Sequence, residues 1–313
     1  VKINLMIVKT VLLGIGNIGA IYDIQKKIGI THASVIKKHK KFKLVAAIDN
    51  NKTRRILFEK KYKIKSYKNI KDFNDVKLAN LLIITFKIKF SYLKKIIVNN
   101  NFEIIIFEKP FNYNPNELSL IKRLLKKNKI KFYINFQRNF SPIYKNMLSN
   151  IKNKSIGGNL KIVCFYSKSF LTNGIHFLSL FLNLSQKITL FKKISNDHLF
   201  IKLGNIEIIF FKTNTYNYNY NAFEIFGSKG KISLTSRPEV LTYYKCAQDK
   251  YFPNYKILKK YRYKNSAIDI QKYLYNEIYL QFNKSGSFLS NQTFNNKYIN
   301  FLKKYKNEKN IKI

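Results

Sequence analysis

The 313-residue sequence has no tryptophan and only two cysteines, five prolines and eleven glycines. Cys164 and Cys246 lie far apart, without a Cys-x-x-Cys or Cys/His spacing around them, which argues against a structural zinc site, and we expect no metal. This sparse cysteine usage is typical of a reducing compartment, so we expect a cytoplasmic protein. No run reaches the roughly 18 apolar residues that a membrane span needs, so none is predicted.

Acidic residues are also scarce, because 16 Asp and Glu stand against 59 Lys and Arg, which gives a formal net charge of +43. Such a balance ordinarily suggests a nucleic acid or an anionic membrane surface as partner. However, the lysines are spread along the whole chain, and arginine, which suits phosphate and base recognition best, is rare. A bias of the whole sequence, such as an adenine- and thymine-rich genome, accounts for this spread. We therefore predict no specific nucleic-acid partner and keep a basic surface binder as an alternative.

The stretch "LLGIGNIGAIYD" contains three glycines at the G-x-G-x-x-G spacing of dinucleotide-binding turns. It follows the apolar run "KTVLL" and precedes "AIYDIQKKI", whose apolar spacing is typical of a helix. A strand, a glycine turn and a helix N-terminus together direct backbone N–H groups at an anion. This context favours a nucleotide cradle over a purely structural turn. The predicted cofactor-binding residues of the turn are Gly14, Gly16, Asn17, Ile18 and Gly19.

A second apolar stretch, "FKLVAAID", ends in Asp49, which we expect to accept the ribose hydroxyls of a dinucleotide. Asp49 follows Gly19 by 30 residues instead of the usual distance of about 20, so we interpret part of "GITHASVIKKHKK" as an insertion. A carboxylate here repels a 2′-phosphate, which favours NAD over NADP. Arg54 and Arg55, together with Lys52, lie just downstream and could soften that repulsion.

The order of the remaining apolar segments predicts an α/β protein with two domains, each near the usual size of about 150 residues. Expected strands alternate with helical stretches in the first part, which is typical of a parallel sheet. From about residue 158, strands follow one another directly, which favours an open and mainly antiparallel sheet closed by helices at 266–282 and 292–306. We predict a Rossmann doubly wound parallel sheet in residues 1–120 and an α/β domain with a large open sheet in residues 121–313. The expected strands of the parallel sheet are 10–14, 43–49, 80–85, 103–107 and 131–136.

Three further motifs carry a family resemblance: "IIIFEKPF" with Glu108 and Lys109, "LTNGIHFLSLFL" with His176, and "FEIFGSKGKI". With the glycine turn before them, they resemble the Gfo/Idh/MocA family of glucose-fructose oxidoreductase, inositol 2-dehydrogenase and rhizopine-catabolism proteins over nearly the whole chain. The stretches "YD", "THA" and "NFQRNFSP" are similar to a branch encoded with bacterial surface-sugar genes. The resemblance implies NAD(P)-dependent hydride transfer to or from a secondary alcohol of a sugar or nucleotide-sugar, by a homo-oligomer that is a dimer or tetramer.

The resemblance also implies roles for single residues. His176 would exchange the alcohol proton, which suits a histidine near neutral pH, and Lys109 would stabilise developing negative charge on the same oxygen. The alternatives are a histidine of the core and one surface lysine among many. Thr85, Glu108 and Lys109 would contact the cofactor, and the implied substrate-binding residues are Arg138, Thr172 and Asn173.

The sequence departs from the family pattern at several of these positions. Thr172 and Ser179 stand where the family often has acids near the histidine, and Phe90 stands where it typically has a histidine after the third strand. Without those carboxylates, His176 loses a partner that could raise its basicity or fix its tautomer. These departures leave open a degenerate nucleotide-binding sensor or scaffold without efficient turnover.

Overall fold

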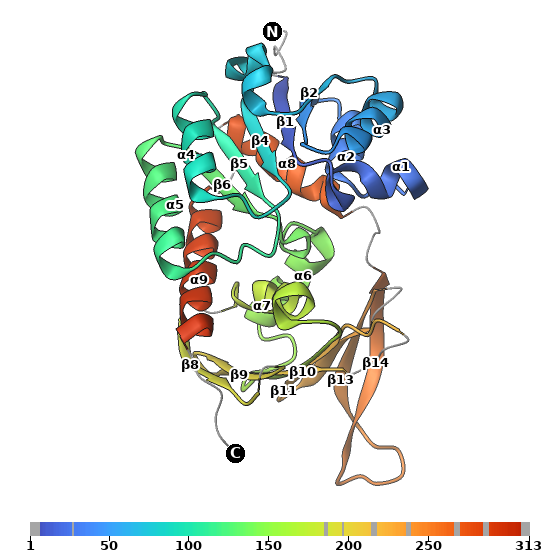
Figure 1. The fold of residues 1–313 in the computed structure, drawn as a ribbon. Coiled ribbons are helices and arrows are strands. Elements are labelled where there is room, and N and C mark those ends of the chain that lie inside the picture. The colour runs from blue at the N-terminus through green and yellow to red at the C-terminus, as the bar shows by residue number, and fades with distance from the viewer. Residues whose placement is uncertain are drawn as a thin grey trace. The chain divides into compact units, whose positions relative to one another are not determined.

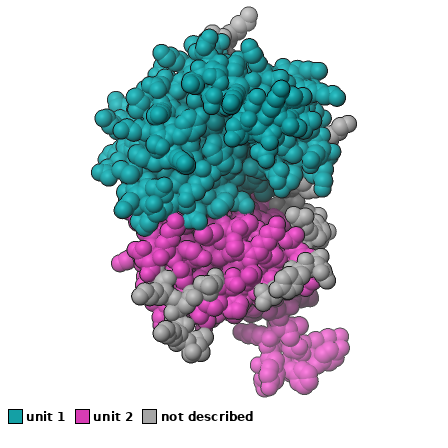
Figure 2. Space-filling view, viewed as in Figure 1, with its two compact units in different colours: residues 1–137, 268–295 teal, residues 138–267, 296–313 magenta. Residues whose placement is uncertain are grey.

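A computed structural model describes residues 7–26, 28–184, 187–195, 197–213, 218–235, 239–265, 270–283 and 288–307. The chain divides into two compact units, coloured separately in Figure 2. Unit 1 contains residues 1–137 and 268–295, and unit 2 contains residues 138–267 and 296–313.

Unit 1 is an α/β layer built on a parallel sheet with the strand order β3-β2-β1-β4-β5-β6 (Figure 1). All five strand pairings are parallel. The central strands β4 and β5 are fully apolar and buried, and β1 is buried except at Lys9, as expected when helices cover both faces. This arrangement confirms the predicted Rossmann sheet. The strands are β1 (Val8–Leu13), β2 (Phe42–Ile48), β3 (Ser66–Tyr67), β4 (Leu81–Ile84), β5 (Ile104–Phe107) and β6 (Lys131–Ile134).

Three helices of unit 1 begin after a residue whose side chain caps them, namely Thr31, Asn51 and Asn114. At α5, the Asn114 side chain accepts a hydrogen bond from the Glu117 backbone N–H, the Glu117 carboxylate accepts one from the Asn114 backbone N–H, and Pro115 occupies the first turn. The helices of this unit are α1 (Tyr22–Lys26), α2 (His32–Lys38), α3 (Lys52–Tyr62), α4 (Phe90–Val98), α5 (Pro115–Lys127) and α8 (Gln271–Phe282).

The boundary between the units lies after residue 137, whereas the sequence prediction placed one boundary after residue 120. Strand β6 completes the parallel sheet, and α5 connects it to β5. Residues 268–295 return to the same unit. The return is explained by packing, because the buried ring of Tyr275 in α8 lies 5.3 Å from that of Phe42 in β2. Residues 266–269 of the helix predicted at 266–282 lie outside the described residues.

Unit 2 contains a sheet with the strand order β14-β13-β12-β11-β7-β10-β9-β8 (Figure 1). Among the described strands of this sheet, only β10 and β7 pair in parallel, so the sheet is mainly antiparallel, as predicted. Its strands are β7 (Lys161–Tyr166), β8 (Ile188–Lys193), β9 (His198–Leu203), β10 (Ile206–Lys212), β11 (Ala222–Gly227), β12 (Gly230–Thr235), β13 (Val240–Gln248) and β14 (Lys256–Asn265).

Two helices of unit 2 matter for the site: α6 (Pro142–Lys152) and α7 (Ile175–Phe181). The last helix, α9 (Phe288–Asn307), spans the sequence boundary between the units. Among the helices that the structure describes, none has the length and apolar character that crossing a membrane requires.

Candidate active site

The glycine turn directly follows β1 and leads into a π-helical turn at Asn17–Ile21 and then α1. The three glycines differ in their backbone conformation and in the space around them. Gly14 has a φ of +103°, and a Cβ there would lie 2.2 Å from the Thr85 Oγ1, while a Cβ on Gly19 would lie 2.4 Å from the Gly14 carbonyl oxygen. A Cβ on Gly16, in contrast, would meet no atom within 4 Å. The space beside Gly16 therefore suits the close approach of a pyrophosphate to the backbone.

Asp49 follows the end of β2 and is fastened to the same turn. Its Oδ2 accepts the backbone N–H of Ile15 at 2.7 Å, and its Oδ1 accepts the backbone N–H of Asn51 at 2.8 Å. A carboxylate has about four acceptor positions, so these two bonds leave capacity for ribose hydroxyls. Arg54 Nη1 lies 3.8 Å from Oδ2, and Arg55 Nη1 donates to the Asp49 carbonyl oxygen at 2.8 Å.

Thr85 follows β4, the strand beside β1 in the sheet, and hydrogen-bonds to the glycine turn. Its Oγ1 donates to the Gly14 carbonyl oxygen at 3.0 Å, and its backbone N–H donates to the Leu13 carbonyl oxygen. The neighbouring Phe86 is 46% exposed and would lie 2.9 Å from a Cβ on Gly14. The structure thus brings the predicted residues Gly14 and Thr85 into direct contact.

Glu108 and Lys109 follow β5, so they lie at the same carboxyl edge as the residues after β1, β2 and β4. Open α/β sheets bind ligands at this edge. The Glu108 Oε1 accepts a hydrogen bond from His32 Nε2 at 2.8 Å and one from the Asn135 side-chain amide, and its Oε2 accepts the Lys109 backbone N–H at 3.2 Å. The Glu108 side chain is 6% exposed, and Lys109 is half-buried.

His176 belongs to unit 2 and lies in the first turn of α7, which continues a π-helical turn at Phe170–Gly174. Its side chain is half-buried, while Ser179 donates to its backbone carbonyl oxygen at 2.7 Å. Ser179 therefore hydrogen-bonds to the helix backbone at the position where the family often has an acid. Gly174 is required by packing, because a Cβ there would lie 2.6 Å from the Phe170 ring.

Thr172 and Asn173 lie in the same turn and are half-buried. Thr172 Oγ1 lies 2.7 Å from the Ser169 Oγ, and the backbone N–H groups of both predicted residues donate to the Ser169 carbonyl oxygen. The turn therefore holds the two predicted substrate-binding residues just before the helix that carries His176.

Arg138, the third predicted substrate-binding residue, forms an ion pair with Glu239 in unit 2. Tyr144 in α6 donates to the other oxygen of the Glu239 carboxylate, and the Arg138 guanidinium lies 5.6 Å from the Phe177 ring centre. Burial by itself would lower the pKa of Arg138, but the charge of Glu239, the nearby Tyr144 and the hydrogen bonds to both together outweigh burial and raise that pKa above its ordinary value. The geometry thus commits much of the guanidinium to holding Glu239 and the face of Phe177.

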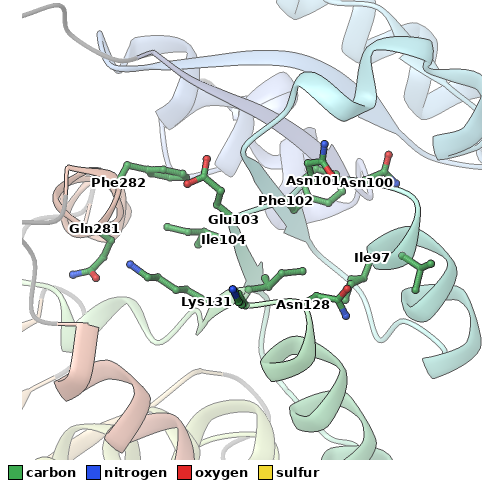
Figure 3. Close-up of a pocket in the computed structure, with 13 residues that line it drawn as sticks. Ile97, Asn100, Asn101, Phe102, Glu103, Ile104, Asn128, Lys131, Gln281 and Phe282 are labelled. Carbon is green, nitrogen blue, oxygen red and sulfur yellow. The ribbon is translucent and has the colours of Figure 1, made fainter.

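Unit 1 contains a cavity of about 400 Å³ (Figure 3). It is lined by residues at the starts of β5 and β6, including Glu103, Ile104 and Lys131, and by Gln281 and Phe282 of α8. The starts of these parallel strands form the edge opposite to that of Glu108. This cavity is therefore not the predicted dinucleotide site.

Sequence reasoning missed the residues that hold the predicted ones. Asn135 and His32 contact Glu108, and Glu239 contacts Arg138. His32 and Asn135 had a signal, since they lie in the "THA" and "NFQRNFSP" stretches that carried part of the family resemblance, whereas Glu239 had none.

Comparison with known proteins agrees with this geometry. Residues 8–136 match the family model described as "Oxidoreductase family, NAD-binding Rossmann fold", that of Gfo/Idh/MocA. None of the curated protein sequences compared with the chain matches it.

Solved structures share the fold along almost the whole chain. An oxidoreductase from Agrobacterium radiobacter in complex with NAD+, L-tartaric acid and magnesium is 13% identical, with a TM-score of 0.70 and 94% of each chain covered. A dehydrogenase (MviM) from Clostridium difficile is 17% identical, with a TM-score of 0.68 and 96% of this chain and 99% of that chain covered.

KijD10, a 3-ketoreductase from Actinomadura kijaniata in complex with NADP and TDP-benzene, is 8% identical, with a TM-score of 0.72 and 97% of this chain and 99% of that chain covered. At these identities the structures show a common fold, and the family model supplies the assignment. The resemblance read from the motifs is confirmed: residues 8–136 match the Gfo/Idh/MocA family of oxidoreductases, with its NAD-binding Rossmann fold.

Proposed function

We propose that the protein transfers a hydride between a nicotinamide dinucleotide and a secondary alcohol or ketone of a sugar or nucleotide-sugar, in the synthesis of a surface polysaccharide. The observation that carries the proposal is the convergence of the glycine turn, Asp49, Thr85 and the Glu108-Lys109 pair at one edge of the parallel sheet. The nucleotide-sugar class is supported by the fold shared with the 3-ketoreductase KijD10.

Each residue has a role that its surroundings allow. The bound dinucleotide supplies or accepts the hydride. The turn at Gly14, Gly16, Asn17, Ile18 and Gly19 admits the pyrophosphate through its backbone N–H groups and the open space beside Gly16. Asp49 accepts the ribose hydroxyls, and its negative charge favours NAD over NADP, although Arg54 lies close to it.

The proton and charge of the substrate oxygen are assigned to two side chains. Lys109 donates a hydrogen bond to that oxygen and stabilises its negative charge, and His176 takes up or returns its proton. Thr172 and Asn173 bind the substrate from the turn before α7. Arg138 contributes the guanidinium N–H groups that do not bind Glu239.

The experiment is a turnover screen of the purified protein with NADH and a panel of keto-sugars and keto-nucleotide-sugars, followed by loss of the reduced-nicotinamide absorbance. Lys109→Met and His176→Asn should each lower turnover about 100-fold or more, as expected for groups that handle the proton and the charge. Lys245→Met, on the exposed part of β13, is the matched control and should turn over normally. Turnover that survives both site variants would refute these assignments.

A nucleotide-binding sensor or scaffold is the second candidate, favoured by Ser179, which binds the His176 backbone where the family often has an acid. It predicts saturable NADH binding without hydride transfer to any substrate of the panel. Turnover that depends on Lys109 and His176 would remove this candidate.

We also propose a homo-oligomer, a dimer or tetramer. Its support is the aromatic face of the unit 2 sheet, where the Phe165 ring lies 6.1 Å from those of Phe211 and Tyr220, and all three side chains are partly exposed. Exposed apolar faces of this kind usually mark association sites. Light scattering of the native protein and of Phe211→Lys measures their molar masses. The variant should shift toward the mass of a monomer, and a native protein that is itself a monomer would refute the proposal.

A further inference from the structure

The side chain of His32, the first residue of α2, is completely buried among polar partners from distant parts of unit 1. Its Nε2 lies 2.8 Å from Glu108 Oε1, and its Nδ1 lies 2.5 Å from Tyr275 Oη and 2.7 Å from Gln271 Nε2. Tyr275 and Gln271, both from α8, are also buried. A buried histidine with three polar neighbours is a specific arrangement, since each unsatisfied polar group would cost about 1–3 kcal/mol.

These neighbours determine which ring nitrogen carries the proton. The amide nitrogen of Gln271 can only donate, so Nδ1 must accept. Tyr275 keeps its proton as well, because burial and the nearby charge of Glu108 raise its pKa well above the ordinary value. The proton of the neutral ring is therefore on Nε2, which donates to the Glu108 carboxylate.

The Glu108 carboxylate accepts hydrogen bonds from three donors. His32 and Asn135 both donate to Oε1, while the Lys109 backbone N–H donates to Oε2. Asn135 is itself buried and follows β6, the strand beside β5. The carboxylate thus has little freedom, and through its bond to the Lys109 backbone it restrains the residue to which the proposed function assigns the substrate oxygen.

Hydrogen bonds in the loop before α2 hold His32 beside Glu108. The carboxylate of Asp23 accepts hydrogen bonds from the Gly29 backbone and from both the backbone and the hydroxyl of Thr31. Thr31 in turn caps α2 by accepting the Ser34 backbone N–H at 3.3 Å. The segment that the sequence indicated as an insertion therefore begins with a turn that Asp23 holds by hydrogen bonds, directly before His32.

We propose that His32 is a positioning residue that sets Glu108 and Lys109 for the nicotinamide half of the dinucleotide. The inference rests on the proposed function, because it assumes that the dinucleotide binds at the glycine turn. The ADP-ribose half is served by the glycine turn and Asp49, which do not depend on His32. Loss of the His32 donor should therefore affect NADH and spare ADP-ribose.

The test compares His32→Gln and His32→Asn by calorimetric titration with NADH and with ADP-ribose. A glutamine amide can reach the position of Nε2 and restore the donor to Glu108, whereas an asparagine amide reaches only the position of Nδ1. We expect His32→Asn to bind NADH about tenfold or more weakly, as for loss of a hydrogen bond to a charged group, and to bind ADP-ribose as the native protein does. His32→Gln should recover most of the NADH affinity.

Two results would overturn the inference alone: unchanged NADH affinity in His32→Asn, or an equal loss for both ligands, which would make His32 a general structural residue. If His32→Asn fails to fold, Asn135→Ser removes the other donor to Glu108 Oε1 and should show the same selective loss. A native protein that binds neither NADH nor ADP-ribose would refute the proposed function itself, and the inference with it.

Discussion

The three glycines of the turn should respond differently to the same substitution, because their surroundings differ. In Gly14→Ala the backbone φ of +103° strains an L-residue by about 1–3 kcal/mol. The new Cβ would also lie 2.2 Å from the Thr85 Oγ1, which must move and lose its hydrogen bond to the Gly14 carbonyl, at a cost of about 1 kcal/mol. We expect a total destabilisation of about 2–4 kcal/mol, which corresponds to a fall in melting temperature of roughly 5–15 °C.

Gly16→Ala should leave folding unchanged or slightly favoured. Its φ of −69° suits alanine, and the added methyl meets no atom within 4 Å, so the smaller entropy of the unfolded chain would stabilise the fold by about 0.4–1 kcal/mol. The methyl would instead occupy the space assigned to the pyrophosphate and weaken NADH binding about tenfold or more.

Thermal unfolding of both variants, with Gly19→Ala beside them, measures the contrast. Gly19→Ala should resemble Gly14→Ala, because its Cβ would lie 2.4 Å from a backbone oxygen that cannot rotate away. The reasoning is refuted if Gly16→Ala is destabilised as much as Gly14→Ala, or if Gly14→Ala unfolds at the native temperature.

Three other substitutions follow from the contacts. Glu239→Gln should destabilise the protein by about 2–4 kcal/mol, because the mostly buried Arg138 then faces a neutral amide; an unchanged midpoint in urea would contradict a structural ion pair. Asp49→Ser should raise the affinity for NADPH relative to NADH about tenfold or more, since the repulsion of a 2′-phosphate is removed, and parallel titrations that leave this ratio unchanged would refute the assigned role. Asp23→Asn tests the pH dependence of stability. Burial raises the pKa of Asp23, but the hydrogen bonds from Thr31 and Gly29 lower it by more, so the net pKa lies below the ordinary 3.8. The carboxylate therefore stabilises the fold above pH 3.8, and this contribution is lost as the pH falls through the folded pKa; unfolding from pH 7 to pH 2 should show a smaller pH dependence in the variant, and identical curves would contradict it.

Much of unit 1 could be predicted because its signals are local. The spacing of Gly14, Gly16 and Gly19 and the apolar runs before and after them lie within a short stretch, and the carboxyl ends of parallel strands meet at one edge of a sheet. This is why residues after four different strands could be expected to serve one ligand before any contact was known.

The supporting contacts could not be predicted, since they join residues that are far apart in the chain. His32 and Glu108 are separated by 76 positions, and His32 and Tyr275 by 243. No periodicity in α8 indicates that one of its tyrosines faces a histidine of another helix. The same limit applies to the return of residues 268–295 to unit 1, which depends on packing against Phe42.

The substrate-binding residues remain predictions, and Arg138 shows why sequence alone is a weak guide to them. An arginine in "NFQRNFSP" fits an anionic substrate by its chemistry, but the structure gives it Glu239 as partner, 101 positions away. A buried side chain of this kind has a structural demand that its own neighbourhood in the sequence does not reveal.

The central claim, that a nicotinamide dinucleotide binds at the glycine turn, is tested most directly by titrating the native protein and Gly16→Asp with NADH and following the nicotinamide fluorescence. The account predicts saturable binding to the native protein and its loss in Gly16→Asp, because a carboxylate would occupy and repel the pyrophosphate position while the fold stays intact. Absence of binding to the native protein, or equal binding to the variant, would contradict it.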